Sequence, residues 1–178
     1  IAIESVYAQR IKDFYELLAH HYSENANYEK AYMFYNLASG KAEKAGAIYD
    51  AIALRQEGIA CIEKLSITDE THEKLISART TLGMYLLQMF YYSEAKSAVE
   101  PIYDLTLKSK NQKAKAHIFI ILGAYYFYID SDVDQSLSIL GRALEMAEDE
   151  NDIVSLFFAN QYLGIVQSYN CNFELAIE

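Results

Sequence analysis

Apolar side chains recur every three to four residues along most of the chain, and short polar segments interrupt this pattern. Such spacing is typical of amphipathic α-helices, in which residues three and four apart share one face. About nine helices are predicted. They cover residues 5–23, 28–44, 47–65, 70–90, 93–108, 114–128, 133–147 and 153–169, with a ninth beginning near residue 173. The short turns between them predict antiparallel helix pairs.

Individual residues mark where several of these helices end or bend. Gly46 is expected to end the second helix, because glycine readily adopts the left-handed conformation that follows many helix C-termini. Thr68 or Asp69 is expected to cap the fourth helix. Pro101 falls inside the fifth helix and should kink it, since proline lacks a backbone N–H group.

A Leu-Gly pair recurs at spacings of 40 and 41 residues, and a small residue follows each leucine after about thirteen positions. The pairs lie at 82–83, 122–123 and 163–164, and the small residues are Ala95, Ser136 and Ala176. Self-similarity at this period indicates a stacked-repeat protein. We expect the glycine and the small residue to let neighbouring helices approach closely.

Two further copies extend the pattern towards the N-terminus. In one copy Leu18-Ala19 replaces Leu-Gly, and a weaker copy ends in Ala51 and Gly58. About five repeats then cover residues 1–178, and no segment rich in Pro, Gly or Ser divides them. We therefore expect a single continuous repeat domain.

Composition and charge favour an all-α fold and exclude some classes of partner. Hydrophobic residues make up 52% of the 178 residues, with one Pro and seven Gly, which favours an all-α fold. The formal charge of −10 would repel nucleic acid and anionic membrane surfaces, so neither is an expected partner. Cys61 and Cys171 lie far apart and are expected to stay reduced, which fits a cytoplasmic location. No apolar run reaches the roughly 18 residues of a membrane span.

The sequence carries no recognisable catalytic or phosphate-binding motif, so we expect neither an enzyme nor a cofactor. Glu16, His20 and Glu24 share one helical face and could touch a metal ion, but an ordinary solvated face is the favoured interpretation. The aspartates at 130, 132 and 134 lack the remaining residues of a calcium loop and predict a turn. We expect no metal site.

The alternation of large and small residues around Ala19, Gly83, Gly123 and Gly164 resembles the tetratricopeptide repeat. This resemblance implies a right-handed α-solenoid of antiparallel helix pairs, with repeats of about 40 residues instead of the usual 34. Residues 17–52 also resemble a stretch that follows the ATPase module in large bacterial signalling proteins. That likeness implies a fragment cut at both ends from a longer protein with an ATPase, cyclase or transcriptional output domain.

In such a solenoid, a second stripe on the first helix of each repeat would line the concave face. Around Ala19 this stripe is polar and acidic, and it becomes apolar and aromatic further along the chain. The candidate partner-binding residues are Met84, Leu87, Gln88, Ile120, Ala124, Phe127, Tyr128, Gln161, Ile165 and Tyr169. Burial of these side chains between repeats is an equally open interpretation. The stripe lacks the Lys, Arg and Asn cluster that holds a peptide carboxylate in chaperone-binding members of the family.

Two functions remain open. The first is a non-catalytic interaction or scaffold module that docks a peptide segment or another domain of its own chain, with an undetermined oligomeric state. The second is a sensor in which a peptide or small ligand in the groove shifts the shape of the array and controls an attached output domain. A closed pocket near Phe127 and Tyr169 would favour the sensor, and an open groove would favour docking.

Overall fold

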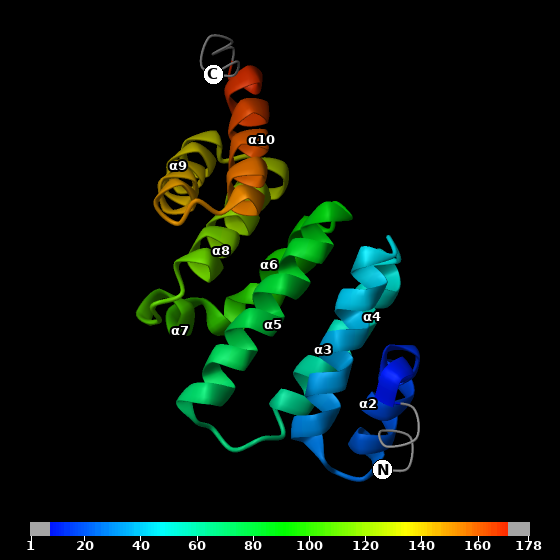
Figure 1. Cartoon of the computed structure of the whole chain (residues 1–178). Helices are drawn as coiled ribbons and strands as arrows, with labels where there is room; N and C mark the ends of the chain where they lie inside the picture. Colours follow the sequence, from blue (N-terminus) through cyan, green and yellow to red (C-terminus); the bar gives the residue numbers. More distant parts are fainter. Residues whose placement is uncertain (1–7, 171–178) are drawn as a thin grey trace. The chain divides into compact units, whose positions relative to one another are not determined.

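The computed structural model describes residues 8–170, which form helices and turns without a strand (Figure 1). The first elements are the 3₁₀-helix η1 (Ala8–Phe14), α2 (Tyr15–Glu24), α3 (Tyr28–Lys44), α4 (Ile48–Ile62) and α5 (Asp69–Gln88). They are followed by α6 (Tyr92–Val99), η2 (Glu100–Ile102), α7 (Tyr103–Lys108), α8 (Gln112–Tyr125), the π-helical turn η3 (Tyr126–Asp130), α9 (Val133–Asp149) and α10 (Ile153–Tyr169). The predicted all-α class is therefore confirmed. The ninth predicted helix, with Phe173 and Ala176, lies outside the described residues, as does Cys171.

The chain divides into two compact units, and the boundary between Ala78 and Arg79 falls within α5. In the N-terminal unit, α3 packs against both α2 and α4. In the C-terminal unit, α8 packs against α6, α9 and α10, and α9 also packs against α10. The right-handed solenoid and the single repeat domain remain predictions.

Within residues 8–170, four helix ends share the same turn geometry. In each, a residue with positive φ is followed by a residue whose N–H donates to the carbonyl oxygen five positions earlier, at 2.9–3.0 Å. The positive-φ residues are Ala26, Gly46, Phe90 and Asn151, and the donors after them are Asn27, Ala47, Tyr91 and Asp152. This is the Schellman arrangement, which satisfies carbonyl groups that a helix end leaves without partners. The predicted stop at Gly46, with φ of 75°, is confirmed.

The turn after η3 is a variant of the same geometry. Ser131 has a φ of 56°, and the N–H of Asp132 donates to the Tyr126 carbonyl six positions earlier, at 2.9 Å. The wider π-helical turn of residues 126–130 accounts for the additional residue. This turn also corrects the sixth predicted helix, because regular α-helix ends at Tyr125.

Side-chain caps define several helix N-termini. Asn27, Asn111, Asp132 and Asp152 each accept a hydrogen bond from a backbone N–H three residues further on. For α5 the structure decides between the two predicted caps, because Thr68 Oγ1 accepts from the N–H of Thr71 at 3.1 Å. These bonds satisfy donors in the first helical turn.

Two predicted helices are less regular in the structure. The first was expected over residues 5–23, but residues 8–14 form 3₁₀-helix, and Arg10 has non-helical angles of φ −122° and ψ 20°. Pro101 breaks the fifth into α6, η2 and α7, so the predicted kink is confirmed. Near this break the Arg79 guanidinium donates to the Ala98 carbonyl at 3.1 Å, which supplies a partner at the C-terminal end of α6.

At two of the three Leu-Gly pairs, a side chain on the glycine would have no room beside its neighbours. A Cβ added at Gly123 would lie 2.5 Å from Leu140 Cγ, and one added at Gly83 would lie 2.7 Å from Ile121 Cδ1. The small residue predicted to face Gly123 does so, because the buried Ser136 hydroxyl donates to the Gly123 carbonyl at 2.8 Å. The repeat therefore encodes close contact between α8 and α9, as predicted.

A partly buried polar cluster joins α8 to the N-terminus of α10. Asp152 caps α10 through Ser155, and its Oδ1 accepts from Lys113 Nζ at 2.9 Å. His117 Nε2 lies 3.8 Å from Asp152 Oδ2 and has no hydrogen-bond partner among the described residues. Burial, reinforced by the positive charge of Lys113 and opposed by Asp152, lowers the pKa of His117 to about 4. Burial tends to raise the pKa of Asp152, but its hydrogen bonds with Ser155 and Lys113 lower it overall.

The glycine contacts predict opposite effects for two alanine substitutions in the same helix pair. Gly123→Ala should lower the free energy of unfolding by about 1–3 kcal/mol, because the new methyl group overlaps the buried Leu140. Gly141→Ala in α9 is the control, since a Cβ there has no atom within 4 Å. It should raise stability by up to about 1 kcal/mol through helix propensity. Urea unfolding of both variants would measure this, and equal stability would contradict the packing role of Gly123.

The environment of His117 predicts a loss of stability in mild acid. Its folded pKa of about 4 lies below the unfolded value of 6.5, so its stabilising contribution is complete above pH 6.5 and declines as the pH falls towards 4. At pH 4.5 the loss should be on the order of 2 kcal/mol. Asp152 adds a further loss only below its unfolded pKa of 3.8.

His117→Gln should therefore reduce the fall in melting temperature between pH 7 and pH 4.5. The control is His20→Gln, which changes an exposed histidine in the N-terminal unit and should retain the wild-type dependence. If His117→Gln instead follows the wild-type curve, another group causes the acid sensitivity.

Candidate partner-binding surface

Among the described residues of the C-terminal unit, six aromatic side chains form one cluster through successive ring contacts. They are Phe90, Tyr92, Phe127, Tyr128, Tyr162 and Tyr169, hereafter the aromatic cluster. Tyr92 stacks on Tyr128 with ring centroids 4.4 Å apart. The other contacts are edge-to-face, at centroid distances from 4.8 to 6.4 Å. Both geometries are favourable for aromatic rings.

Three parts of the unit supply these rings. Phe90 lies in the turn before α6, and Tyr92 is the first residue of α6. Phe127 and Tyr128 lie side by side in the π-helical turn η3. Tyr162 and Tyr169 are seven residues apart in α10, two helical turns along one face. The cluster therefore depends on the packing of segments far apart in the sequence.

The cluster has a buried base and an exposed edge. The Tyr162 side chain is 4% exposed, whereas Phe90 is 71%, Tyr169 is 72% and Tyr128 is 40% exposed. Phe127 is half-buried, and its ring contacts Tyr169 edge to face at 5.3 Å. The rings thus form a continuous surface that is anchored in the core.

Phe90 adopts a backbone conformation that is unfavourable for a large side chain. Its φ of 62° lies in the left-handed region, where non-glycine residues are strained by roughly 1–2 kcal/mol. The equivalent position in the turn after α3 is Gly46. Phe90 gains little packing in return, because its side chain is 71% exposed. Backbone strain without compensating burial is a feature of functional positions.

Burial also alters the acidity of two hydroxyl groups in the cluster. Burial and then the neighbouring Tyr128 hydroxyl raise the pKa of Tyr92 to about 12. Burial raises the pKa of Tyr162 as well, and the nearby hydroxyls of Tyr92 and Tyr128 act in the same direction. Both groups are neutral at physiological pH, so the cluster presents an uncharged surface on a chain with formal charge −10.

The structure separates the ten predicted partner-binding residues by exposure. Four of them are buried core residues: Met84, Leu87, Ile120 and Ala124, with exposed fractions between 0% and 5%. They offer no surface to a partner in the folded chain. Gln88, Tyr128, Gln161 and Tyr169 are exposed, and Phe127 and Ile165 are half-buried.

Of these ten residues, Phe127, Tyr128 and Tyr169 meet in the aromatic cluster. The same cluster contains Phe90, Tyr92 and Tyr162, which were not among the candidates. Phe127 and Tyr169 contact each other edge to face, with ring centroids 5.3 Å apart. Phe90 and Tyr92 belong to a run of three aromatic residues from 90 to 92, at the end of a predicted helix, which was a signal for these two residues. The sequence gives no comparable signal for Tyr162.

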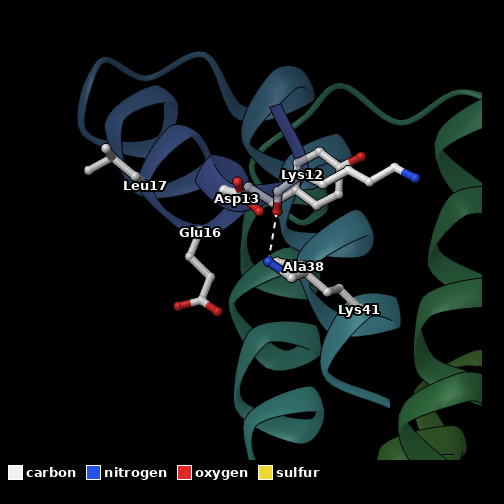
Figure 2. A pocket seen from close by; sticks show the side chains of 7 residues that line it. Lys12, Asp13, Glu16, Leu17, Ala38 and Lys41 are labelled. Carbon is white, nitrogen blue, oxygen red and sulfur yellow. Dashed lines mark hydrogen bonds between the residues drawn. The ribbon is translucent and has the colours of Figure 1, made fainter. Parts of the chain in front are cut away.

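The N-terminal unit contains a separate cavity of about 470 Å³ (Figure 2). Its lining residues are Lys12, Asp13, Tyr15, Glu16, Leu17, Ala38 and Lys41. Lys41 Nζ donates to the Lys12 carbonyl at 2.9 Å, and Glu16 and Leu17 point away from this bond in Figure 2. Two lysines and two carboxylates balance each other, so this cavity does not select a ligand by charge.

The predicted helical face of Glu16, His20 and Glu24 is exposed to solvent. Within residues 8–170, no three His, Cys, Asp or Glu side chains are placed to hold a metal ion. Among the same residues, no helix is both long enough and apolar enough to cross a membrane.

The raised pKa of Tyr162 predicts a loss of stability in alkali. Its contribution is complete below the unfolded pKa of 10 and is lost as the pH rises above that value, because ionisation is easier in the unfolded chain. Tyr162→Phe should therefore lose less stability than the wild type between pH 9 and pH 11.5, as measured by urea unfolding. The control is Tyr169→Phe, since that side chain is 72% exposed, and it should follow the wild type. Parallel curves for all three proteins would contradict the assigned environment of Tyr162.

Comparisons with protein-family models, with curated proteins and with solved structures found no match to this chain.

Proposed function

We propose that this chain is a non-catalytic protein-interaction module that binds an apolar segment of a partner on the aromatic cluster. The observation that carries this proposal is the conformation of Phe90: its backbone is left-handed and its large side chain is exposed to solvent. A glycine would relieve the strain. A phenylalanine at this position is best explained by a contact that the isolated chain does not make.

The composition of the surface supports a protein partner. Tyrosine and phenylalanine supply large contact areas with few rotatable bonds and are enriched in interfaces. Exposed apolar side chains continue the surface at Tyr91 and Ile129, which are 40% and 47% exposed. Because Tyr162 and Tyr92 anchor the exposed rings, binding requires little additional ordering of side chains.

The resemblance to tetratricopeptide repeats gives this module a context. We propose that it acts as a cytoplasmic scaffold in a larger signalling protein, in which the partner is a peptide or another domain of the same chain. The recurring hairpin turns support a repeat architecture: the positive-φ residues at 26 and 46, and again at 131 and 151, are 20 residues apart. Control of an output domain remains the alternative.

Phe90→Gly tests the proposal, because it removes the ring and relieves the backbone strain in one change. The variant should be more stable than the wild type by about 0.5–1 kcal/mol. Peptides selected from a random display library on the wild-type chain should bind Phe90→Gly at least about tenfold more weakly. Fluorescence anisotropy with a selected peptide, together with thermal unfolding, measures both effects.

Ala26→Gly is the matched control. It changes the equivalent left-handed residue in the N-terminal unit and should bring a similar gain in stability with unchanged peptide affinity. If no peptide is enriched, or if the selected peptides bind Phe90→Gly as tightly as the wild type, the aromatic cluster is not the binding surface.

A further inference from the structure

A cavity of about 310 Å³ lies at the bend that Pro101 introduces between α6 and α7. Its lining residues are Lys96, Val99, Glu100, Tyr103, Asp104, Leu122 and Tyr126. Val99 and Leu122 are buried and form an apolar base, while Glu100 and Asp104 are exposed at the rim. The cavity is separate from the aromatic cluster, since the two share no residue.

The two carboxylates at this cavity are without a cation. Among residues 8–170, neither Glu100 nor Asp104 has a side-chain hydrogen bond or an ion pair. Lys96 lies four residues before Glu100 and could form a helical ion pair with it. Instead its ammonium group lies over the Tyr125 ring, 4.1 Å from the centroid. The rim of the cavity is therefore negatively charged, and the Lys96 ammonium contacts the Tyr125 ring instead of neutralising the carboxylates.

The remaining features of the cavity also suit a positive group. Tyr103 and Tyr126 supply aromatic rings, whose faces attract ammonium and guanidinium groups. Val99 and Leu122 can cover the aliphatic stem of a long basic side chain. The C-terminal end of α6 carries the negative end of a helix dipole, and Arg79 already donates a guanidinium hydrogen bond to its Ala98 carbonyl.

We propose that this cavity binds an arginine or lysine side chain of a partner protein. The aliphatic stem lies on Val99 and Leu122, and the cationic group lies between the Tyr126 ring and the carboxylates of Glu100 and Asp104. This inference goes beyond the proposed aromatic docking surface and does not require it. The two sites can succeed or fail independently, because the probe for the cavity carries no aromatic group.

The direct test is an NMR titration of the full chain with the N-acetylated amide of arginine. We expect saturable shifts at the backbone amides of residues 96–104 and 122–126, with millimolar affinity. The matched citrulline compound has nearly the same shape but no charge, and it should cause no saturable shift. Glu100→Gln/Asp104→Asn should weaken binding at least about tenfold, because it removes both charges. Lys96→Met should strengthen binding, since it removes the competing cation.

Glu94→Gln/Asp134→Asn is the matched control. It removes the same amount of charge from exposed positions outside the cavity and should leave the affinity unchanged. Equal binding of the citrulline compound, unchanged affinity of the Glu100→Gln/Asp104→Asn variant, or shifts confined to other residues would overturn the proposal. n-Propylguanidine, a monocation with the same guanidinium and stem but no backbone amides, separates the sources of the ligand: tighter binding of n-propylguanidine than of the arginine amide overturns the assignment to a protein side chain. Circular dichroism melting curves confirm that each variant is folded.

Discussion

The close approach of α9 to α8 at Gly123 is the contact on which the C-terminal unit depends. There is no room for a side chain at Gly123, since the Leu140 side chain occupies that space. The Ser136 hydroxyl bonds to the carbonyl of the same glycine, so one residue carries both a steric and a polar contact. These contacts set the distance between the two helices and thereby the position of η3, which continues α8 and carries Phe127 and Tyr128. The packing of α9 against α8 therefore helps to position the two aromatic rings of η3 in the candidate surface.

The turns determine where side chains emerge from this framework. A left-handed residue follows α3, α9 and the helix before α6, and the next residue is the N-cap of the following helix. Glycine fits this position best, and three of the four Schellman turns accept another residue at an energetic cost. At Phe90 the cost is combined with an exposed ring, whereas at Ala26 and Asn151 the side chains are small or polar. This difference is the reason for assigning Phe90 a role in binding.

The aromatic cluster and the acidic cavity lie at the two ends of α6. Tyr92 opens this helix and Glu100 follows its last residue, a separation of roughly 12 Å at 1.5 Å per residue. An apolar contact at one end and a charged contact at the other would give a partner segment a fixed direction along the helix. Apolar burial supplies most of the affinity in such an arrangement, and the charged contact supplies selectivity.

Much of the local structure follows from the sequence alone. The helices at 28–44 and 153–169 have the predicted bounds, because polar turn residues flank uninterrupted helical periodicity. The effects of Gly46 and Pro101 are equally local, since both depend on the backbone of a single residue. The Leu-Gly spacing also identified the close helix contacts, because only glycine leaves the space that Leu140 fills.

Tertiary structure alone decided which apolar residues reach solvent. The assignment of Ile120 and Ala124 to a surface stripe assumed that α8 has one free face, but every residue from 118 to 124 is buried, because other helices pack around it. Apolar residues of a central helix and of a binding surface have the same composition, so periodicity does not distinguish them. The meeting of Tyr92, Tyr128 and Tyr162 likewise requires α6, η3 and α10 to pack together. The sequence by itself determined the helices and their close contacts, whereas exposure and the convergence of distant rings depend on packing between helices.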